Sequence, residues 1–503
     1  MSKWTGPSVL VMIFLGGCMV GPTYRRPVSP LPEAYTSVVG PASASVGMPL
    51  WWRQFNDPLL DRLIAKALSD NYDMQAAALR IQQARTREAL TRGGQGPKLT
   101  ASAQASDTRL SANALPSGLA GLLGSGASDG GPETGPEMET GLGLPGTAFS
   151  AYQAGFDALW EPDLFGGQHR AAEAAQARTQ ASVWTQRDAQ VSLTAEVANS
   201  YLQYRFYQKR LALADDTLTA AQQSVALTQA RQRNGLGDTT AVRQAEADLA
   251  QVAALRDQMA AEADIRLQTL AYLLGPASAE MVAEVSATPA PAFADIIIPA
   301  GLPSVLLQRR PDIRAAERQL AAATADIGTA RADLYPKLSL TGVAQLVSQS
   351  LSSLLEGDSV QASLAGRLSL PIIDGAVRRN SVALHEARAS EAAALYQKQV
   401  FAALREVETA LTRLEGDRQA LAHLAAAEAA AQDAAETADI RYRHGLVAQA
   451  GVLTARRRHL SAQDAVVQAE ATHAQDMVAF YKALGGGWVP DALPNGGTDD
   501  TAD

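Results

Sequence analysis

The chain has little of what enzymes and nucleic-acid-binding proteins need. Only 5% of its 503 residues are aromatic. The formal net charge is -9, with acids and bases mixed, which argues against the basic stripe of a nucleic-acid surface. The six histidines show no metal-ligand spacing, and the sequence has no glycine-rich loop that would cradle a phosphate. We therefore expect no catalytic residue, metal, cofactor or nucleic-acid partner, and any energy must come from a partner protein.

Cysteine is almost absent, because Cys18 is the single one, and this excludes an intramolecular disulfide. A basic residue, Lys3, and a short apolar run over 9–15 precede it, which is typical of a secretory signal. The run is too short to span a bilayer as a helix. Leu15-Gly16-Gly17-Cys18 resembles the bacterial lipobox, so we predict cleavage after residue 17 and lipid attachment at Cys18. The alternative is a signal peptide that happens to contain a cysteine. Met19, where inner-membrane retention signals have Asp, favours the outer membrane.

Proline is absent from two long stretches, Asp163–Gly275 and Ile372–Val489, although the chain has 24 prolines. Since proline breaks helix interiors, each stretch predicts long helices. Each contains one obvious breaker, at Gly235 or Gly445, so we predict helical hairpins over about 166–275 and 375–485 with their turns at these glycines. The first arms, at 1.5 Å per residue, would be roughly 100 Å long. Their apolar residues recur every 3.5 positions, the signature of a coiled coil.

The mature chain also lacks any run of 18 apolar residues, so a membrane crossing would have to use strands. Apolar and polar residues alternate with a period of two in four segments. These predict strands over about 98–106, 147–160, 337–347 and 360–371. Four strands are too few to close a membrane barrel, for which about eight is the lower limit. Either the strands lie outside the membrane or several chains share one barrel.

The chain contains one unit twice. Asn71-Tyr72-Asp73 leads through a helical pattern to Pro97-Lys98-Leu99, and Arg310-Pro311-Asp312 leads over the same distance to Pro336-Lys337-Leu338. Duplicated units of this size are common in transport proteins. The predicted order is a signal peptide over 1–17, an extended lipidated segment over 18–56, a first repeat over 57–287, a linker over 288–302, a second repeat over 303–487 and a disordered tail over 488–503.

Several sequence blocks occur along the chain in a specific order. They are Gly21-Pro22-Thr23-Tyr24, Trp51-Trp52-Arg53-Gln54-Phe55-Asn56-Asp57-Pro58, Leu307-Gln308-Arg309-Arg310-Pro311-Asp312-Ile313, Tyr335-Pro336-Lys337-Leu338, Leu370-Pro371-Ile372-Ile373-Asp374-Gly375 and Tyr481-Lys482-Ala483-Leu484-Gly485-Gly486-Gly487-Trp488. Over nearly the whole mature chain they resemble the outer membrane factor family, the TolC-like exit ducts of tripartite efflux pumps, and especially its lipidated OprM/NodT-type branch.

This resemblance implies a mainly α fold with transmembrane β-strands. Each chain would contribute a duplicated helix–strand–strand–helical hairpin unit. Three chains would form a homotrimer with a periplasmic α-barrel tunnel and a shared β-barrel in the outer membrane of a Gram-negative bacterium. The implied partners are outer-membrane lipid, a periplasmic adaptor (membrane fusion) protein and an inner-membrane pump such as an RND transporter. The implied function is the passive exit of small molecules such as drugs.

The resemblance also directs attention to the periplasmic tip, where the two hairpin turns would meet. Asp238 lies in the first turn, and Tyr442, with Arg443 beside it, matches a tyrosine that helps to hold the tip closed in relatives. Relatives commonly carry rings of Leu and Asp just after the second turn, but Ala450 and Thr454 occupy those positions here. We therefore expect a tip constriction without an acidic ring.

Three questions stay open at the level of sequence. The run Arg456-Arg457-Arg458 fits either a solvated helix face or a contact with the adaptor or gate. An alternative to small-molecule efflux is a duct for secreted proteins. A non-transport coiled-coil envelope lipoprotein would explain Cys18 and the heptads, but not the alternating strand pairs.

Overall fold

The computed structural model describes residues 19–27, 32, 48–109, 148–290 and 309–488. They form two compact units, described separately below. The first comprises residues 1–24, 87–175 and 324–387, and the second comprises 25–86, 176–323 and 388–503. The predicted signal peptide, Cys18 and most of the predicted linker and tail lie outside the described residues. Within the described ranges, no helix is both long and apolar enough to cross a membrane.

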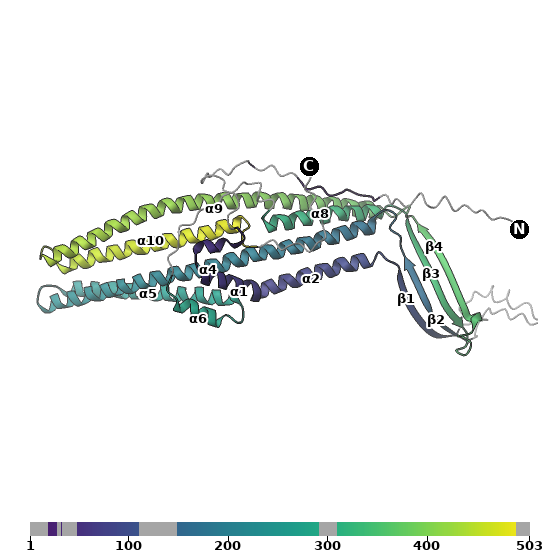
Figure 1. The fold of residues 1–503 in the computed structure, drawn as a ribbon, viewed down its shortest axis with the longest axis horizontal. Coiled ribbons are helices and arrows are strands. Elements are labelled where there is room, and N and C mark those ends of the chain that lie inside the picture. The colour runs from purple at the N-terminus through teal and green to yellow at the C-terminus, as the bar shows by residue number, and fades with distance from the viewer. Residues whose placement is uncertain (1–18, 28–31, 33–47, 110–147, 291–308, 489–503) are drawn as a thin grey trace, which may run out of the picture. The chain divides into compact units, whose positions relative to one another are not determined.

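The first unit contains one four-stranded antiparallel sheet (Figure 1). Its strands are β1 (Lys98–Arg109), β2 (Ala148–Trp160), β3 (Lys337–Ser348) and β4 (Val360–Ser369), in the spatial order β1-β2-β3-β4. The short helix η2 (Gly357–Ser359) precedes β4. Each repeat thus supplies one hairpin, and the two hairpins pair through β2 and β3. Strands β1 and β4 each pair on one side only, so both outer edges of the sheet are unpaired within the described chain.

The two faces of this sheet differ in chemistry. The register aligns Ala101 with Phe156, Phe156 with Ala344, and Gly342 with Leu364, and directly opposed residues point to the same face. The alternating apolar residues of all four strands therefore gather on one face, where Leu364 is 86% exposed. The opposite face is polar, with Ser102 donating to Asp157 at 3.1 Å and Gln153 to Gln104 at 2.7 Å. The sheet therefore separates an apolar side from a polar side.

Within the described residues, three helices of the first half recur in the same order in the second half. The first half contains α1 (Pro58–Asp70), α2 (Tyr72–Gly93), α4 (Gly167–Arg233), α5 (Thr239–Leu274) and α6 (Ala279–Ala287). The second contains α8 (Pro311–Ala332), α9 (Val377–Arg443) and α10 (Gln449–Ala483). Helices α4 and α9 each have 67 residues, so every position of α4 has a counterpart 210 residues later in α9. Each is followed by a returning helix, α5 or α10 (Figure 1).

The apolar core of the second unit lies where η1 (Met48–Phe55) and α1 pack on the long helices. Trp51 is fully buried and stacks on Tyr481 of α10 at 5.1 Å between ring centroids. Asp57 caps α1 by accepting a hydrogen bond from the backbone N–H of Leu59 at 3.0 Å. The same carboxylate accepts from the hydroxyl of Tyr201 on α4. Burial raises the pKa of the Tyr481 hydroxyl to about 12, and desolvation raises that of Tyr201 further.

The structure bears out the mainly helical fold with four strands and corrects the prediction in detail. The segment predicted to be extended over 18–56 contains the 3-10 helix η1, because its Trp and Phe side chains are buried in the core. Helix α6 was not predicted at all. Strand β1 continues to Arg109, past the expected end at 106, because every residue of the extension pairs with β2. Strand β4 ends at Ser369 and not at 371, where the chain meets Pro371.

Candidate functional site

The two hairpin turns of the second unit have the same backbone geometry. Gly235 (φ 70°) and Gly445 (φ 73°) adopt the left-handed conformation that glycine tolerates best. After α4, the N–H groups of Gly235 and Leu236 donate to the carbonyls of Gln232 (3.0 Å) and Arg231 (2.8 Å). Gly445 and Leu446 repeat this pattern after α9. Both turns are therefore Schellman motifs, which end the outgoing helices in the same way.

The returning helices begin differently. Asp238 caps α5, and its carboxylate accepts from the N–H of Ala241 at 2.8 Å. Its counterpart before α10 is Ala448, which has no side chain that could cap the helix. A capping Asp stabilises a helix by about 1 kcal/mol relative to Ala. The second turn is therefore the less stabilised of the two.

The tip residues singled out by sequence are exposed in the single chain. Tyr442 is 42% exposed, and Arg443 forms an ion pair with Asp439 one helical turn earlier. Thr454 donates to the carbonyl of Ala450 at 2.9 Å, so these two lie together on one face of α10. Among the described residues, no hydrogen bond or ion pair connects either of them with Tyr442 or Asp238.

Ion pairs that the sequence did not reveal join the two hairpins. Arg457 of α10 lies 3.5 Å from Asp248 of α5, close to the turns. Farther from the turns, Arg210 of α4 forms a bidentate ion pair with Asp464 of α10, with N–O distances of 2.7 and 3.2 Å. Arg457 is the middle residue of the arginine run whose role was left open. Sequence shows such a run but not the acid that approaches it from another helix.

A shallow recess of about 440 Å³ lies beside the second turn, between α9 and α10. Small side chains form much of its wall, with Ala434 and Ala438 one helical turn apart on α9 and Gly451 facing them from α10. Arg441 and Asp433 supply one charge of each sign at its margin. A helix of another protein would be able to approach the backbone closely here.

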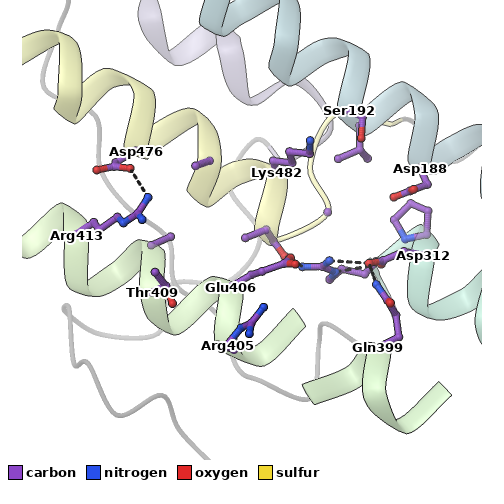
Figure 2. Close-up of a pocket in the computed structure, with 17 residues that line it drawn as sticks. Asp188, Ser192, Asp312, Gln399, Arg405, Glu406, Thr409, Arg413, Asp476 and Lys482 are labelled. Carbon is purple, nitrogen blue, oxygen red and sulfur yellow. Dashed lines mark hydrogen bonds and ion pairs between the residues drawn. The ribbon is translucent and has the colours of Figure 1, made fainter. Parts of the chain in front are cut away.

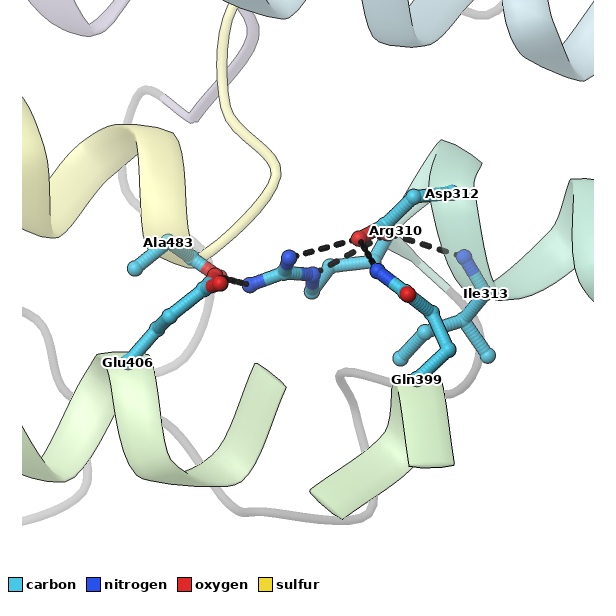
Figure 3. Close-up of polar contacts among 6 residues, drawn as sticks. All are labelled: Arg310, Asp312, Ile313, Gln399, Glu406 and Ala483. Carbon is cyan, nitrogen blue, oxygen red and sulfur yellow. Dashed lines mark hydrogen bonds and ion pairs between the residues drawn. The ribbon is translucent and has the colours of Figure 1, made fainter. Parts of the chain in front are cut away.

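Arg310, immediately before α8, is the centre of a buried polar network (Figure 3). Its side chain is 8% exposed and donates to the carboxylates of Asp312 (2.6 Å) and Glu406 (2.8 Å) and to the carbonyl of Ala483 (2.7 Å). Gln399 also donates to Asp312. Burial opposes ionisation of Asp312, but Arg310 and Gln399 outweigh it and lower the pKa of this carboxyl. The network joins α8, α9 and α10.

The Arg310 network forms one wall of a cavity of about 610 Å³ (Figure 2). Asp188 of α4 and Lys482 of α10 also line it. Burial raises the pKa of the Asp188 carboxyl, and nearby Asp312 raises it further against the attraction of Arg310 and Lys482. The cavity could not be predicted, because its residues come from four helices that are distant in sequence. Its only sequence signal was the Arg310-Pro311-Asp312 block.

Within the described residues, no group of three or more histidine, cysteine or acidic side chains is arranged to hold a metal ion.

Comparison with known proteins agrees with this architecture. The model of the family described as outer membrane efflux protein matches residues 63–276 and 302–486. Outer membrane protein OprJ of Pseudomonas aeruginosa is 32% identical over 489 residues, covering 96% of this chain and 95% of OprJ. The toluene efflux pump outer membrane protein TtgC of Pseudomonas putida is 31% identical, covering 94% and 93%. The solved outer-membrane channel OprN superposes with a TM-score of 0.80 at 33% identity, covering 94% of this chain and all of that one.

The chain therefore belongs to the outer membrane efflux protein family. It is an outer-membrane protein of a Gram-negative bacterium and serves as the exit duct of an efflux pump. The family forms channels.

Proposed function

We propose that three copies of this chain form one duct, which passively conducts small molecules such as drugs from an inner-membrane pump and a periplasmic adaptor to the exterior. The observation that carries this proposal is the sheet, which has one apolar face, one polar face and two unpaired edges. Unpaired backbone groups are costly in lipid, so these edges need partners. Strand β4 of one copy pairing with β1 of the next would satisfy them.

Three copies with four strands each would close a twelve-stranded sheet with lipid outside and water inside. The strands have 10 to 13 residues. About 9–11 residues suffice for a tilted strand to cross a bilayer. The exposed apolar side chains would then face lipid, and the Ser, Thr and Gln side chains would line the passage. A coiled-coil lipoprotein without a transport function has no use for such a two-faced sheet.

The hairpin turns form the gate in this proposal. Contacts around Tyr442 and Arg443 hold the tip closed, and the Arg457–Asp248 pair ties one hairpin to the other. Arg457 and Asp248 are each more than a third exposed, so the pair contributes only about 0–1 kcal/mol. Closure therefore depends on several weak contacts, which a partner can replace with modest differential affinity. The second hairpin, whose returning helix lacks a side-chain cap, is the one that moves.

The adaptor docks at the recess beside the second turn. Its small side chains allow close helix packing, and its charges of both signs suit a polar helical tip. Contact there bears directly on the hairpin assigned to move, which couples docking to opening. An RND transporter in the inner membrane is the proposed source of cargo and energy.

Small-molecule efflux is favoured over protein secretion because several relatives that align over nearly the whole chain are named as outer membrane proteins of efflux pumps, one of them a toluene efflux pump. The cargo of this chain follows from its pump, and transport assays would identify it.

The experiment combines a mass measurement with crosslinking in cells. The purified protein in detergent should have the mass of three chains. A photo-crosslinking residue at Ala438 should capture the adaptor encoded with the pump, identified by mass spectrometry, whereas the same residue at Leu364 should not. A monomer that conducts ions, or equal capture from both positions, would contradict the proposal.

A further inference from the structure

The cavity beside Arg310 is lined by many charged side chains. Its lining contains four basic and four acidic residues, which are Arg310, Arg405, Arg413 and Lys482, and Asp188, Asp312, Glu406 and Asp476. Its volume of about 610 Å³ is in the range of small-molecule sites. Most of these charges already satisfy one another. Arg310 binds Asp312 and Glu406, and Arg413 approaches Asp476 at 3.5 Å.

Three charged groups are left over. Within the described chain, Asp188, Lys482 and Arg405 have neither an ion pair nor a side-chain hydrogen bond. Asp188 and Lys482 approach the cavity from α4 and α10 (Figure 2). A carboxylate that is partly removed from water and accepts no hydrogen bond is costly. The cavity thus has one half-buried acid and two exposed bases whose hydrogen-bonding groups are available to a ligand.

The duplication provides an internal comparison of the residues at equivalent positions. Lys398 of α9 is the counterpart of Asp188, and Tyr272 of α5 is the counterpart of Lys482, each 210 residues away. The acid of the first copy is thus a lysine in the second, and the amine of the second copy is a tyrosine in the first. The duplication repeats neither charge, so this pair of charges occurs at this one place in the fold.

The cavity opens on the face of the helix layer that η1 leaves uncovered. On α10, Tyr481 packs on Trp51 of η1, whereas Ala479, about 200° around the helix, lines the cavity. On α4, Asp188 lines the cavity, while Gln190, again two residues away, lines a separate recess beside Trp52.

We propose that this cavity is a binding site for small zwitterions, in which Asp188 receives an ammonium group and Lys482 receives an acidic group. The ligand class follows from the free charges, since a simple cation would leave both bases unpaired and a simple anion would leave the acid unpaired. The site is distinct from the tip contacts, and no adaptor or pump is needed for binding. A failure of this inference would leave the proposed gate untouched.

Saturation-transfer NMR on the full-length protein in detergent tests this, with 6-aminohexanoate as the probe and hexylamine and hexanoate as single-charge controls. The zwitterion should bind more tightly than either control. Asp188→Asn should weaken its binding about tenfold, as expected for loss of a charged hydrogen bond, without affecting hexanoate. Lys482→Tyr, which introduces the residue found at the equivalent position of the first copy, should weaken binding of the zwitterion without affecting binding of hexylamine. Asp216→Asn, an exposed site on the same helix, should change nothing.

Thermal unfolding separates binding from a structural role. If Asp188 and Lys482 serve only as an ion pair between α4 and α10, Asp188→Asn lowers the melting temperature and leaves probe binding unchanged, which would overturn the proposal. If Asp188 is kept for a ligand, Asp188→Asn leaves the melting temperature of the empty protein equal or higher. Equal affinity for the zwitterion and the single-charge probes would also overturn it.

Discussion

Asn71 and Arg310 occupy equivalent positions in the two halves of the chain, and each side chain donates a hydrogen bond to the equivalent backbone carbonyl. Each residue immediately precedes a 22-residue helix. Asn71 donates to the carbonyl of Leu273 at 3.0 Å, and Arg310 donates to the carbonyl of Ala483 at 2.7 Å. Ala483 lies 210 positions after Leu273 and is its counterpart in the second half. The shared contact ties the start of one helix to the end of another. Arg310 adds two carboxylate partners that Asn71 lacks.

Arg310→Ala should therefore destabilise the second unit strongly. The change removes the carbonyl contact and leaves Asp312 buried without its cation, a loss of about 3–5 kcal/mol. Circular dichroism at 222 nm during heating should show a lower melting temperature. Arg413→Ala is the matched control, because its side chain is 63% exposed and its ion pair contributes about 0–1 kcal/mol. Equal melting temperatures for the two variants would contradict the role given to Arg310.

Asp188 and Asp312 should affect stability with opposite dependence on pH. Because folding raises the pKa of Asp188, the folded state binds the carboxyl proton more tightly than the unfolded state does. The free energy of unfolding therefore falls as the pH rises from the ordinary pKa of 3.8 through the raised pKa of the folded state. Because folding lowers the pKa of Asp312, its contribution is present above 3.8 and is lost as pH falls through the lowered value.

Denaturant unfolding between pH 3 and pH 7 tests this pair of signs. Asp188→Asn should be as stable as the wild type or more stable at pH 7, and the difference should shrink toward acid pH. Asp312→Asn should be less stable at pH 7, and its deficit should also shrink toward acid pH. If both variants lose stability to the same extent at pH 7, Asp188 has a partner that stabilises its ionised form.

The caps of the returning helices predict a difference between the two hairpin turns. Asp238→Ala should destabilise the start of α5 by about 1 kcal/mol, whereas Ala448→Asp should stabilise the start of α10 by a similar amount. Hydrogen exchange of the backbone amides in the two turns would measure both effects. Exchange that is equally fast at the two turns of the wild type would contradict the assignment of the second hairpin as the mobile one.

The lipid anchor remains a prediction from sequence, since Cys18 lies outside the described residues. Cys18→Ser should abolish metabolic labelling with a fatty acid, because the chain has no other cysteine. The sheet would still insert the protein in the membrane, so outer-membrane fractions should contain the variant. Labelling that persists in Cys18→Ser would sink the lipobox assignment.

Local patterns explain what the sequence predicted well and what it missed. Alternation along each strand depends on neighbouring residues alone, so the sequence predicts an apolar face for each strand, whereas only the pairing of the strands shows that these faces lie on one side of the sheet. The turn glycines were visible because nothing else interrupts 67-residue helices. Helix α6 is only nine residues long and lies among prolines, so the sequence shows too short a helical period to predict it.

The functional contacts were harder to predict because they are set by packing. Arg457 and Asp248 lie 209 residues apart, and only the docking of the two hairpins brings them together. Asp188 belongs to no sequence motif. The residues that surround it in the cavity and shift its pKa, such as Asp312 and Lys482, belong to other helices. Tyr442 was selected by resemblance alone, and its part in the gate is a proposal.

Single-channel conductance in a planar bilayer tests the central claim most directly, namely that three chains form a duct held closed at its tip. The wild type should insert as a trimer and conduct weakly. Arg457→Ser, and separately the pair Tyr442→Phe with Arg443→Ser, should raise the conductance, because each removes part of the set of contacts that holds the hairpins together. Thr454→Ala, whose hydroxyl only bonds within its own helix, should conduct like the wild type. Conductance at the wild-type level in all of these variants would contradict the account.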